Sequence, residues 1–127
     1  MEKMHDIWPE GLEVIDSSGD GYEVLVRYQS WRVAVITYAE RFDVQKICRL
    51  ERHLETDEVF VLMAGDATLF IGQEGAPVAM ERYKAYNIKR GAWHGICVSR
   101  DAKVLICENE DTGLENTEYM PWKPLKP

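Results

Sequence analysis

The sequence predicts an all-β protein with a single domain, built as a sandwich or a barrel. Short runs of apolar residues follow one another about every ten residues, separated by turn residues, which is the pattern of such folds. No segment repeats its apolar residues at the helical period of about 3.6 residues over several turns. At 127 residues the chain can bury one core of its own. We divide it into an N-terminal arm (1–21), a β-barrel (22–110) and a C-terminal tail (111–127) that packs on the barrel.

The first predicted strands lie in the arm and directly after it. Within the arm, Leu12–Ile15 is a short possible strand, and the turn residues Ser17–Gly21 end it. Apolar and polar side chains alternate along Tyr22–Tyr28 and again along Trp31–Tyr38. Because only Gln29 and Ser30 separate these two runs, we expect them to form a β-hairpin.

Further short strands are predicted along the rest of the barrel, after a polar connection. They are 46–53, 58–64, 68–72, 78–83, 86–89, 94–99 and 103–108. The run Val59–Ala64 is apolar at every position, which is typical of a strand that is buried on both faces.

The C-terminal tail shows little regular structure. Thr112–Glu115 carries a capping-box pattern that can start a single helical turn. Residues Pro121–Pro127 contain too many prolines to join the interior of a sheet. We expect Trp122 to anchor this tail on the body of the protein.

Composition excludes several classes of function. The chain is 46% hydrophobic and 29% charged, as globular proteins are. Its net charge is −7, and its basic residues are scattered, which does not favour nucleic-acid binding. The apolar run Val59–Ala64 is far too short to span a membrane, and Met1–Asp6 lacks the apolar core of a signal peptide. We therefore expect a soluble cytoplasmic protein that binds neither nucleic acid nor membrane.

The three cysteines show no metal-binding or redox spacing. Cys48, Cys97 and Cys107 lie inside apolar runs, and their number is odd. We interpret them as small buried apolar residues outside any disulfide framework.

Three residues with metal-binding side chains bracket the polar loop Leu54–Asp57. Glu51 and His53 are two residues apart, so in a strand they point to the same face. If the loop closes a four-residue hairpin, His53 and Glu58 lie opposite each other, with Cβ atoms about 4.5–5.5 Å apart. Side chains at that separation can share one small cation.

This segment resembles the first motif of the cupin family, which has the form His-x-His, three or four residues, Glu, six residues, Gly. His53 matches the second histidine, Glu58 the carboxylate and Gly65 the turn glycine. Glu51 stands where the family has its first histidine.

The second cupin motif, Pro-x-Gly-x-x-His, is also present. Gly91 and His94 match it, whereas Lys89 takes the place of the proline. With the strands around them, the two motifs cover residues 45–108 of this sequence.

The resemblance implies an all-β fold of the jelly-roll type, the double-stranded β-helix barrel of cupins, with a pocket between its two sheets. It also implies a divalent metal, because His53, Glu58 and His94 stand at positions that cupins use for ligands. A set of nitrogen and oxygen ligands suits manganese, iron, nickel, cobalt or zinc. The family further implies a homodimer.

Glu51 has three possible roles in such a site. Its carboxylate can be a fourth metal ligand beside His53, or it can act as a general base or acid without binding the metal. Alternatively, the replacement of the histidine by Glu51 marks the loss of the metal.

Strand alternation also predicts the residues that line the pocket. Arg49 is expected to face the same interior as Glu51, where it would either clamp a substrate carboxylate or phosphate or pair with a neighbouring glutamate at the mouth. Phe60 shares a face with Glu58, and Ile96 shares one with His94, so both should form an apolar wall for a small molecule.

Two other segments near the motifs are assigned no role in the chemistry. Trp93 precedes His94 and should point the opposite way, into packing. The acidic stretch 108–111 is interpreted as a solvated edge rather than a substrate contact.

The sequence therefore favours a metal-dependent enzyme that acts on a small polar metabolite, of the sugar or carboxylic-acid type. The resemblance leaves isomerase, lyase and dioxygenase chemistry open. A non-catalytic cupin that binds a sugar, or a metal-free cupin that serves as an interaction protein, are the alternatives. The sequence has no dinucleotide-binding, P-loop or nucleophile-elbow motif.

Overall fold

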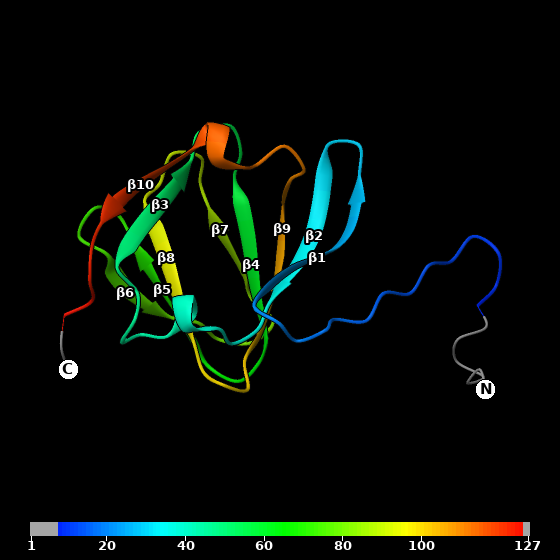
Figure 1. Cartoon of the computed structure of the whole chain (residues 1–127), viewed down its shortest axis with the longest axis horizontal. Helices are drawn as coiled ribbons and strands as arrows, with labels where there is room; N and C mark the ends of the chain where they lie inside the picture. The colour runs from blue at the N-terminus through cyan, green and yellow to red at the C-terminus, as the bar shows by residue number, and fades with distance from the viewer. Residues whose placement is uncertain (1–7, 126–127) are drawn as a thin grey trace.

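The computed structural model describes residues 8–125 and consists almost entirely of β-strands joined by short loops (Figure 1). In chain order the elements are β1 (Tyr22–Tyr28), β2 (Trp31–Ile36), the 3₁₀ turn η2 (Glu40–Phe42), β3 (Arg49–His53), β4 (Glu58–Ala64), β5 (Ala67–Ile71), β6 (Ala76–Ala79), β7 (Ala85–Ile88), β8 (His94–Val98), β9 (Lys103–Asn109), the 3₁₀ turn η3 (Leu114–Asn116) and β10 (Thr117–Pro121).

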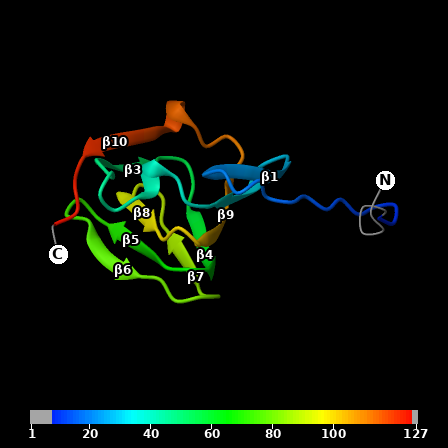
Figure 2. The ribbon, with the colours of Figure 1, turned by 60° about the horizontal axis from the view of Figure 1, so that its bottom comes forward.

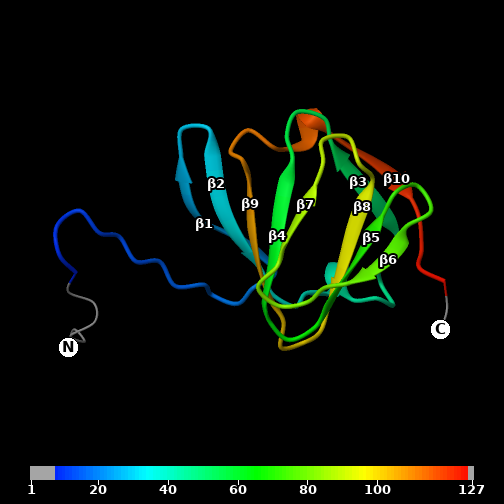
Figure 3. The same ribbon diagram turned by 180° about the vertical axis from the view of Figure 1, so that it is seen from behind.

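The strands form two five-stranded antiparallel sheets that face each other. One sheet has the order β1-β2-β9-β4-β7, and the other has the order β10-β3-β8-β5-β6. Figure 2 and Figure 3 show the two sheets from other directions, with the N-terminal arm extending away from them. The predicted all-β, double-sheet barrel is confirmed.

The hydrophobic core fills the space between the sheets. It is supplied mainly by alternate residues of β2, β4, β5, β8 and β9, as a period of two requires. Its most buried members are Ala34, Ile36, Phe60, Leu62, Leu69, Ala102, Val104 and Ile106. Strand β4 is not buried on both faces, as its apolar sequence had suggested, because Met63 is exposed and Val59 and Val61 are only partly buried.

The loop 54–57 connects the two sheets and does not close a hairpin. Strand β3 pairs with β10 and β8, whereas β4 pairs with β9 and β7, so the predicted pairing of β3 with β4 is wrong. A short polar loop can either close a hairpin within one sheet or connect two sheets, and its sequence does not distinguish the two. Only the sheet that each strand joins decides between them.

Several predicted elements at the two ends of the chain differ in the structure. Leu12–Ile15 forms no strand, and its apolar side chains Leu12, Val14 and Ile15 are exposed. At the other end, β10 adds to the edge of the second sheet next to β3, a strand that the sequence analysis did not predict. The strand ends at Pro121, and an edge position is where proline is tolerated.

Trp122 anchors the tail as expected. Its ring packs on Phe70 with a centroid distance of 4.9 Å, and its Nε1–H donates to the carbonyl oxygen of Glu74 at 3.2 Å. The helical turn predicted from Thr112 is present as η3, which begins at Leu114.

The cysteines are less buried than predicted. All three are free thiols, but Cys48 and Cys107 are exposed and only Cys97 is partly buried. Cys107 lies between the inward residues Ile106 and Glu108 of β9 and therefore points outward. Between residues 8 and 125 there is no helix long and apolar enough to cross a membrane.

Gly65 makes the tight turn between β4 and β5, which lie in different sheets. Its φ is +70°, and a Cβ atom at this position would lie 2.6 Å from the Cα atom of Ala102. We expect Gly65→Ala to lower the free energy of unfolding by about 2 kcal/mol or more, because backbone strain adds to a clash with the main chain.

Urea denaturation of Gly65→Ala and Gly72→Ala tests this expectation. Gly72 has a φ of +84° but no heavy atom within 4 Å of a built Cβ, so it carries the strain without the clash. Equal losses of stability in the two variants would contradict a role for the contact with Ala102.

Candidate metal centre

Four predicted ligands come from three strands and meet in one cavity between the sheets. Glu51 and His53 lie on the inward face of β3, Glu58 begins β4, and His94 begins β8. The Cα atoms of Glu51 and His94 are direct partners across the β3–β8 pair. All four side chains line a cavity of about 340 Å³, which is the size of a pocket for a small molecule.

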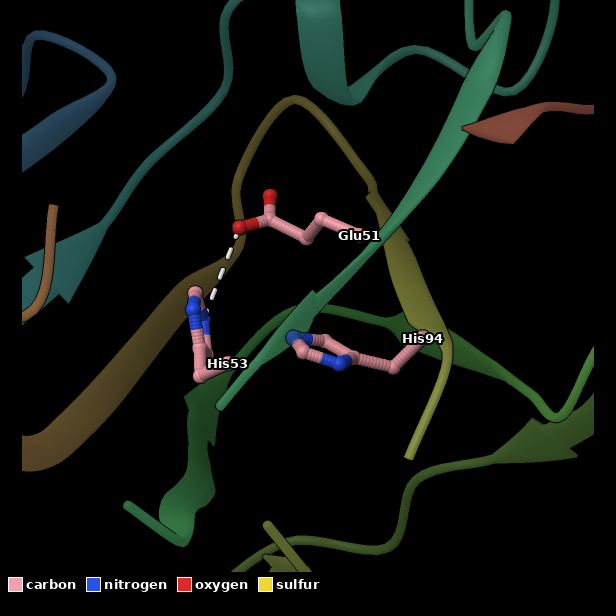
Figure 4. Close-up of side chains that lie close together, drawn as sticks. All are labelled: Glu51, His53 and His94. Atoms are coloured by element: carbon pink, nitrogen blue, oxygen red, sulfur yellow. Dashed lines mark ion pairs between the residues drawn. The ribbon is translucent and has the colours of Figure 1, made fainter. Parts of the chain in front are cut away.

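The two histidines converge on one carboxylate oxygen. The Nε2 atom of His53 lies 3.0 Å from Oε1 of Glu58, and Nε2 of His94 lies 3.1 Å from the same oxygen. Oε2 of Glu51 lies 3.5 Å from Nε2 of His53, and a dashed line in Figure 4 marks this pair. The side chains of His53, Glu58 and His94 are 8%, 6% and 4% exposed, whereas Glu51 is 40% exposed.

The other nitrogen of each imidazole is held by the protein. Nδ1 of His94 lies 3.0 Å from the carbonyl oxygen of Ala92, and because a carbonyl only accepts, this nitrogen carries the proton. Nδ1 of His53 lies 2.9 Å from the hydroxyl of Thr117, which belongs to β10. A neutral His94 therefore turns the lone pair of Nε2 toward Oε1 of Glu58. Two lone pairs at this distance repel unless a proton or a metal ion lies between them.

The electrostatics of the site favour positive charge. Burial raises the pKa of Glu58, but the hydrogen bonds and charges of His53 and His94 outweigh burial and hold this pKa below its usual value. Burial lowers the pKa of both histidines, yet the hydrogen bond and charge of Glu58 raise these pKa values above the ordinary one. The buried carboxylate thus attracts a cation, either as protons on the imidazoles or as a metal ion.

The residues predicted to line the pocket do so. Phe60 and Ile96 are buried in the cavity wall, and the ring of Phe60 meets His94 edge-on, with centroids 6.2 Å apart. Arg49 also lines the cavity but is exposed, with its guanidinium group 3.9 Å from the ring centre of Tyr119. Trp93 points out of the cavity and packs in a second, smaller core, as expected.

A buried polar cluster next to the predicted ligands was missed by the sequence analysis. Glu108 is not part of a solvated edge, since its side chain is only 2% exposed. Its Oε2 accepts hydrogen bonds from the hydroxyl of Tyr22 at 2.6 Å and from Nη2 of Arg32 at 3.2 Å. All three residues line the same cavity as Glu58.

This cluster changes the chemistry of the cavity wall. Burial first, and then the charge of Glu58, raise the pKa of Glu108. Burial and the bond to Glu108 also raise the pKa of Tyr22. Glu108 has an oxygen within 4.8 Å of ligand atoms of His53 and Glu58, so it is a further carboxylate near the centre. Alternation along β9, from Val104 through Ile106 to Glu108, is the signal that could have found it.

Comparisons with known proteins identify the fold. The sequence matches no protein-family model, and no curated protein matches it. Solved structures do match. A cupin-2 domain protein from Shewanella frigidimarina is 17% identical, with a TM-score of 0.55 over 71% of this chain and 80% of that one.

Two further structures cover more of the chain. A protein from Klebsiella pneumoniae with a double-stranded β-helix domain is 14% identical, with a TM-score of 0.58 over 87% of this chain and 91% of that one. Pac13 of Streptomyces, described as a nucleoside dehydratase, is 6% identical, with a TM-score of 0.62 over 89% of this chain and 94% of that one. These likenesses confirm the predicted fold and, at such low identity, show the fold alone.

The pKa shifts predict how the stability of the metal-free protein depends on pH. The raised pKa values of His53 and His94 stabilise the folded state below their unfolded value of about 6.5, and this stability is lost as pH rises through the folded values. The lowered pKa of Glu58 contributes stability above its unfolded value of about 4.3, and this is lost as pH falls through the folded value.

We therefore expect chelator-treated protein to be more stable at about pH 6 than at about pH 9 in urea denaturation, because only the lower pH keeps the imidazoles charged. Glu58→Gln should remove most of this difference. Glu81→Gln, which alters an exposed carboxylate paired with Lys84, should keep it. A difference that survives in Glu58→Gln would contradict the assignment.

Proposed function

We propose that this chain, which has the cupin fold, is a metal-dependent enzyme that converts a small polar metabolite inside its barrel. The proposal assigns His53, Glu58 and His94 as ligands of a divalent metal ion, and Glu51 as the residue that moves a proton. One observation carries it. The Nε2 atoms of two buried imidazoles each lie within 3.1 Å of the same buried carboxylate oxygen, and all three residues line a cavity that is open to solvent.

The residues suit a metal ion, both in the atoms that they offer as ligands and in the hydrogen bonds that orient their rings. Two imidazoles and a carboxylate suit manganese, iron, nickel, cobalt or zinc, and such a set leaves positions open for substrate. The bonds from Nδ1 of His94 to Ala92 and from Nδ1 of His53 to Thr117 orient the rings, as the outer partners of metal ligands do. A divalent ion bound here would polarise a carbonyl or hydroxyl group of the substrate.

The protein's own groups divide the remaining tasks. Glu51 is the most exposed of the four residues and faces the cavity, so its carboxylate can take a proton from a bound molecule and return it. Phe60 and Ile96 are buried apolar residues that line the cavity from the two sheets and exclude water there. Glu108 lies on β9, the neighbour of β4, and its Oε1 has no hydrogen-bond partner among the described residues, which leaves an acceptor beside the centre.

The comparisons support a small-molecule enzyme only in that a protein of the same fold is described as one. Pac13, which shares the fold, is described as a nucleoside dehydratase, so a barrel of this kind can host the conversion of a small polar molecule. A homodimer and a cytoplasmic location stay predictions from the sequence.

Metal content is the direct test of the site. Protein purified without an affinity tag and dialysed without chelator is expected to hold close to one divalent ion per chain, measured by mass spectrometry. His94→Ala should lose it, because removing a ligand leaves an incomplete site. Glu118→Gln, which alters an exposed carboxylate paired with Arg52, is the control that should keep it. Absence of metal from the parent, even after manganese, iron(II), nickel, cobalt and zinc are added in turn, would refute the metal centre.

Glu51→Gln separates proton transfer from metal binding. We expect this variant to keep its metal while turnover of a substrate found by screening sugars and hydroxy acids falls by about 100-fold or more. The amide preserves the shape of Glu51 but cannot accept the proton. Loss of metal from Glu51→Gln would instead make Glu51 a ligand and contradict its assignment as the proton-transfer group.

A further inference from the structure

Three basic side chains gather on the segment that leads into β3. Arg41 lies in η2, Lys46 follows it, and Arg49 begins β3. All three line the same cavity as the histidines, and all three are exposed. They therefore lie at the mouth of the cavity, on a protein whose net charge of −7 would otherwise repel anions.

Within residues 8–125 the charged groups of these three residues have no acidic or hydrogen-bonding partner. Arg27, Arg32 and Arg52 each pair with a glutamate, whereas no ion pair or side-chain hydrogen bond joins Arg41, Lys46 or Arg49 to a described residue. The pairing of Arg49 with a neighbouring glutamate, one of the two expectations for this residue, is therefore not found among them.

Both arginines at the mouth are held against aromatic rings. The Cζ atom of Arg49 lies 3.9 Å from the ring centre of Tyr119, and that of Arg41 lies 4.7 Å from the ring centre of Phe42. A guanidinium group that lies over a ring can still donate from its N–H groups to a carboxylate or a phosphate. These side chains are thus oriented before a ligand binds, which reduces the entropy lost on binding.

The mouth and the candidate metal centre lie on one line along β3. Arg49, Glu51 and His53 are alternate residues on the same inward face, and their exposure falls in that order from exposed through intermediate to buried. Four residues of a strand span about 13 Å. A ligand held at the mouth would therefore extend along β3 to reach the centre.

We infer that Arg41, Lys46 and Arg49 bind an anionic group of the metabolite, a carboxylate or a phosphate, and so hold its other end toward Glu51 and His53. The inference rests on the proposed function for the chemistry at the inner end. Binding of the anion itself depends only on the three basic residues. Uncharged sugars lack the group that this mouth recognises.

Nuclear magnetic resonance of the arginine Nε–H groups tests this inference on the metal-loaded protein. The probes are gluconate, glucose 6-phosphate and, as the neutral control, glucose. We expect the two anions to shift the signals of Arg41 and Arg49 and to bind at least about tenfold more tightly than glucose. Tighter binding of gluconate would identify a carboxylate as the group recognised, and tighter binding of glucose 6-phosphate would identify a phosphate. Raising the ionic strength from about 0.02 M to about 0.3 M should weaken both.

Matched variants locate the effect. Arg41→Gln combined with Arg49→Gln should weaken anion binding by about tenfold or more with metal content unchanged. Arg100→Gln is the control, because Arg100 is also exposed and stacked, on Tyr38 at 4.3 Å, but does not line this cavity. Anion binding that is equally tight in the double variant, or no shift with either anion, would overturn the inference. If the protein takes up none of the metals offered, the metal centre is refuted, and shifts of Arg41 and Arg49 with either anion would leave the anion site standing.

Discussion

The carboxylate of Glu58, buried between two imidazoles, is the interaction on which the rest of the site depends. A buried carboxylate without a partner costs several kcal/mol, so the fold must supply positive charge beside it. His53 and His94 supply that charge from the opposite sheet. One carboxylate therefore holds the two sheets to a common point, and the same need for a cation makes this point suited to a metal ion.

Charged residues of opposite sign lie on the two sides of this point. On β9, Glu108 adds a second buried carboxylate, whose Oε2 accepts hydrogen bonds from Arg32 and Tyr22 while its Oε1 has no partner among the described residues. At the mouth, Arg41 and Arg49 add positive charge without protein partners among the described residues. Such arrangements cost stability in an empty cavity, and they become favourable when a ligand of complementary charge binds.

Much of the site could be predicted from particular residues. Alternation along β4 and β8 correctly placed Phe60 beside Glu58 and Ile96 beside His94, because the side chains of a strand have a period of two. Glu108 and Arg32 follow the same rule. Glu108 was missed because the acidic stretch 108–111 at the end of a strand was interpreted as a solvated edge. The edge strand β10 was missed because its sequence, Thr117–Pro121, has no clear apolar alternation and ends in proline.

By itself the sequence determined most of the strand pattern and the inward faces, since these depend on side-chain type and spacing along each strand, and its motifs picked out the residues that meet in the cavity. Tertiary structure alone decided that residues 54–57 cross between sheets, and that Thr117 reaches His53 from β10. It also decided that Arg41 lies at the same mouth as Arg49. Contacts of this kind join residues that are distant in sequence or lie in different sheets, and no local spacing encodes how two sheets face each other.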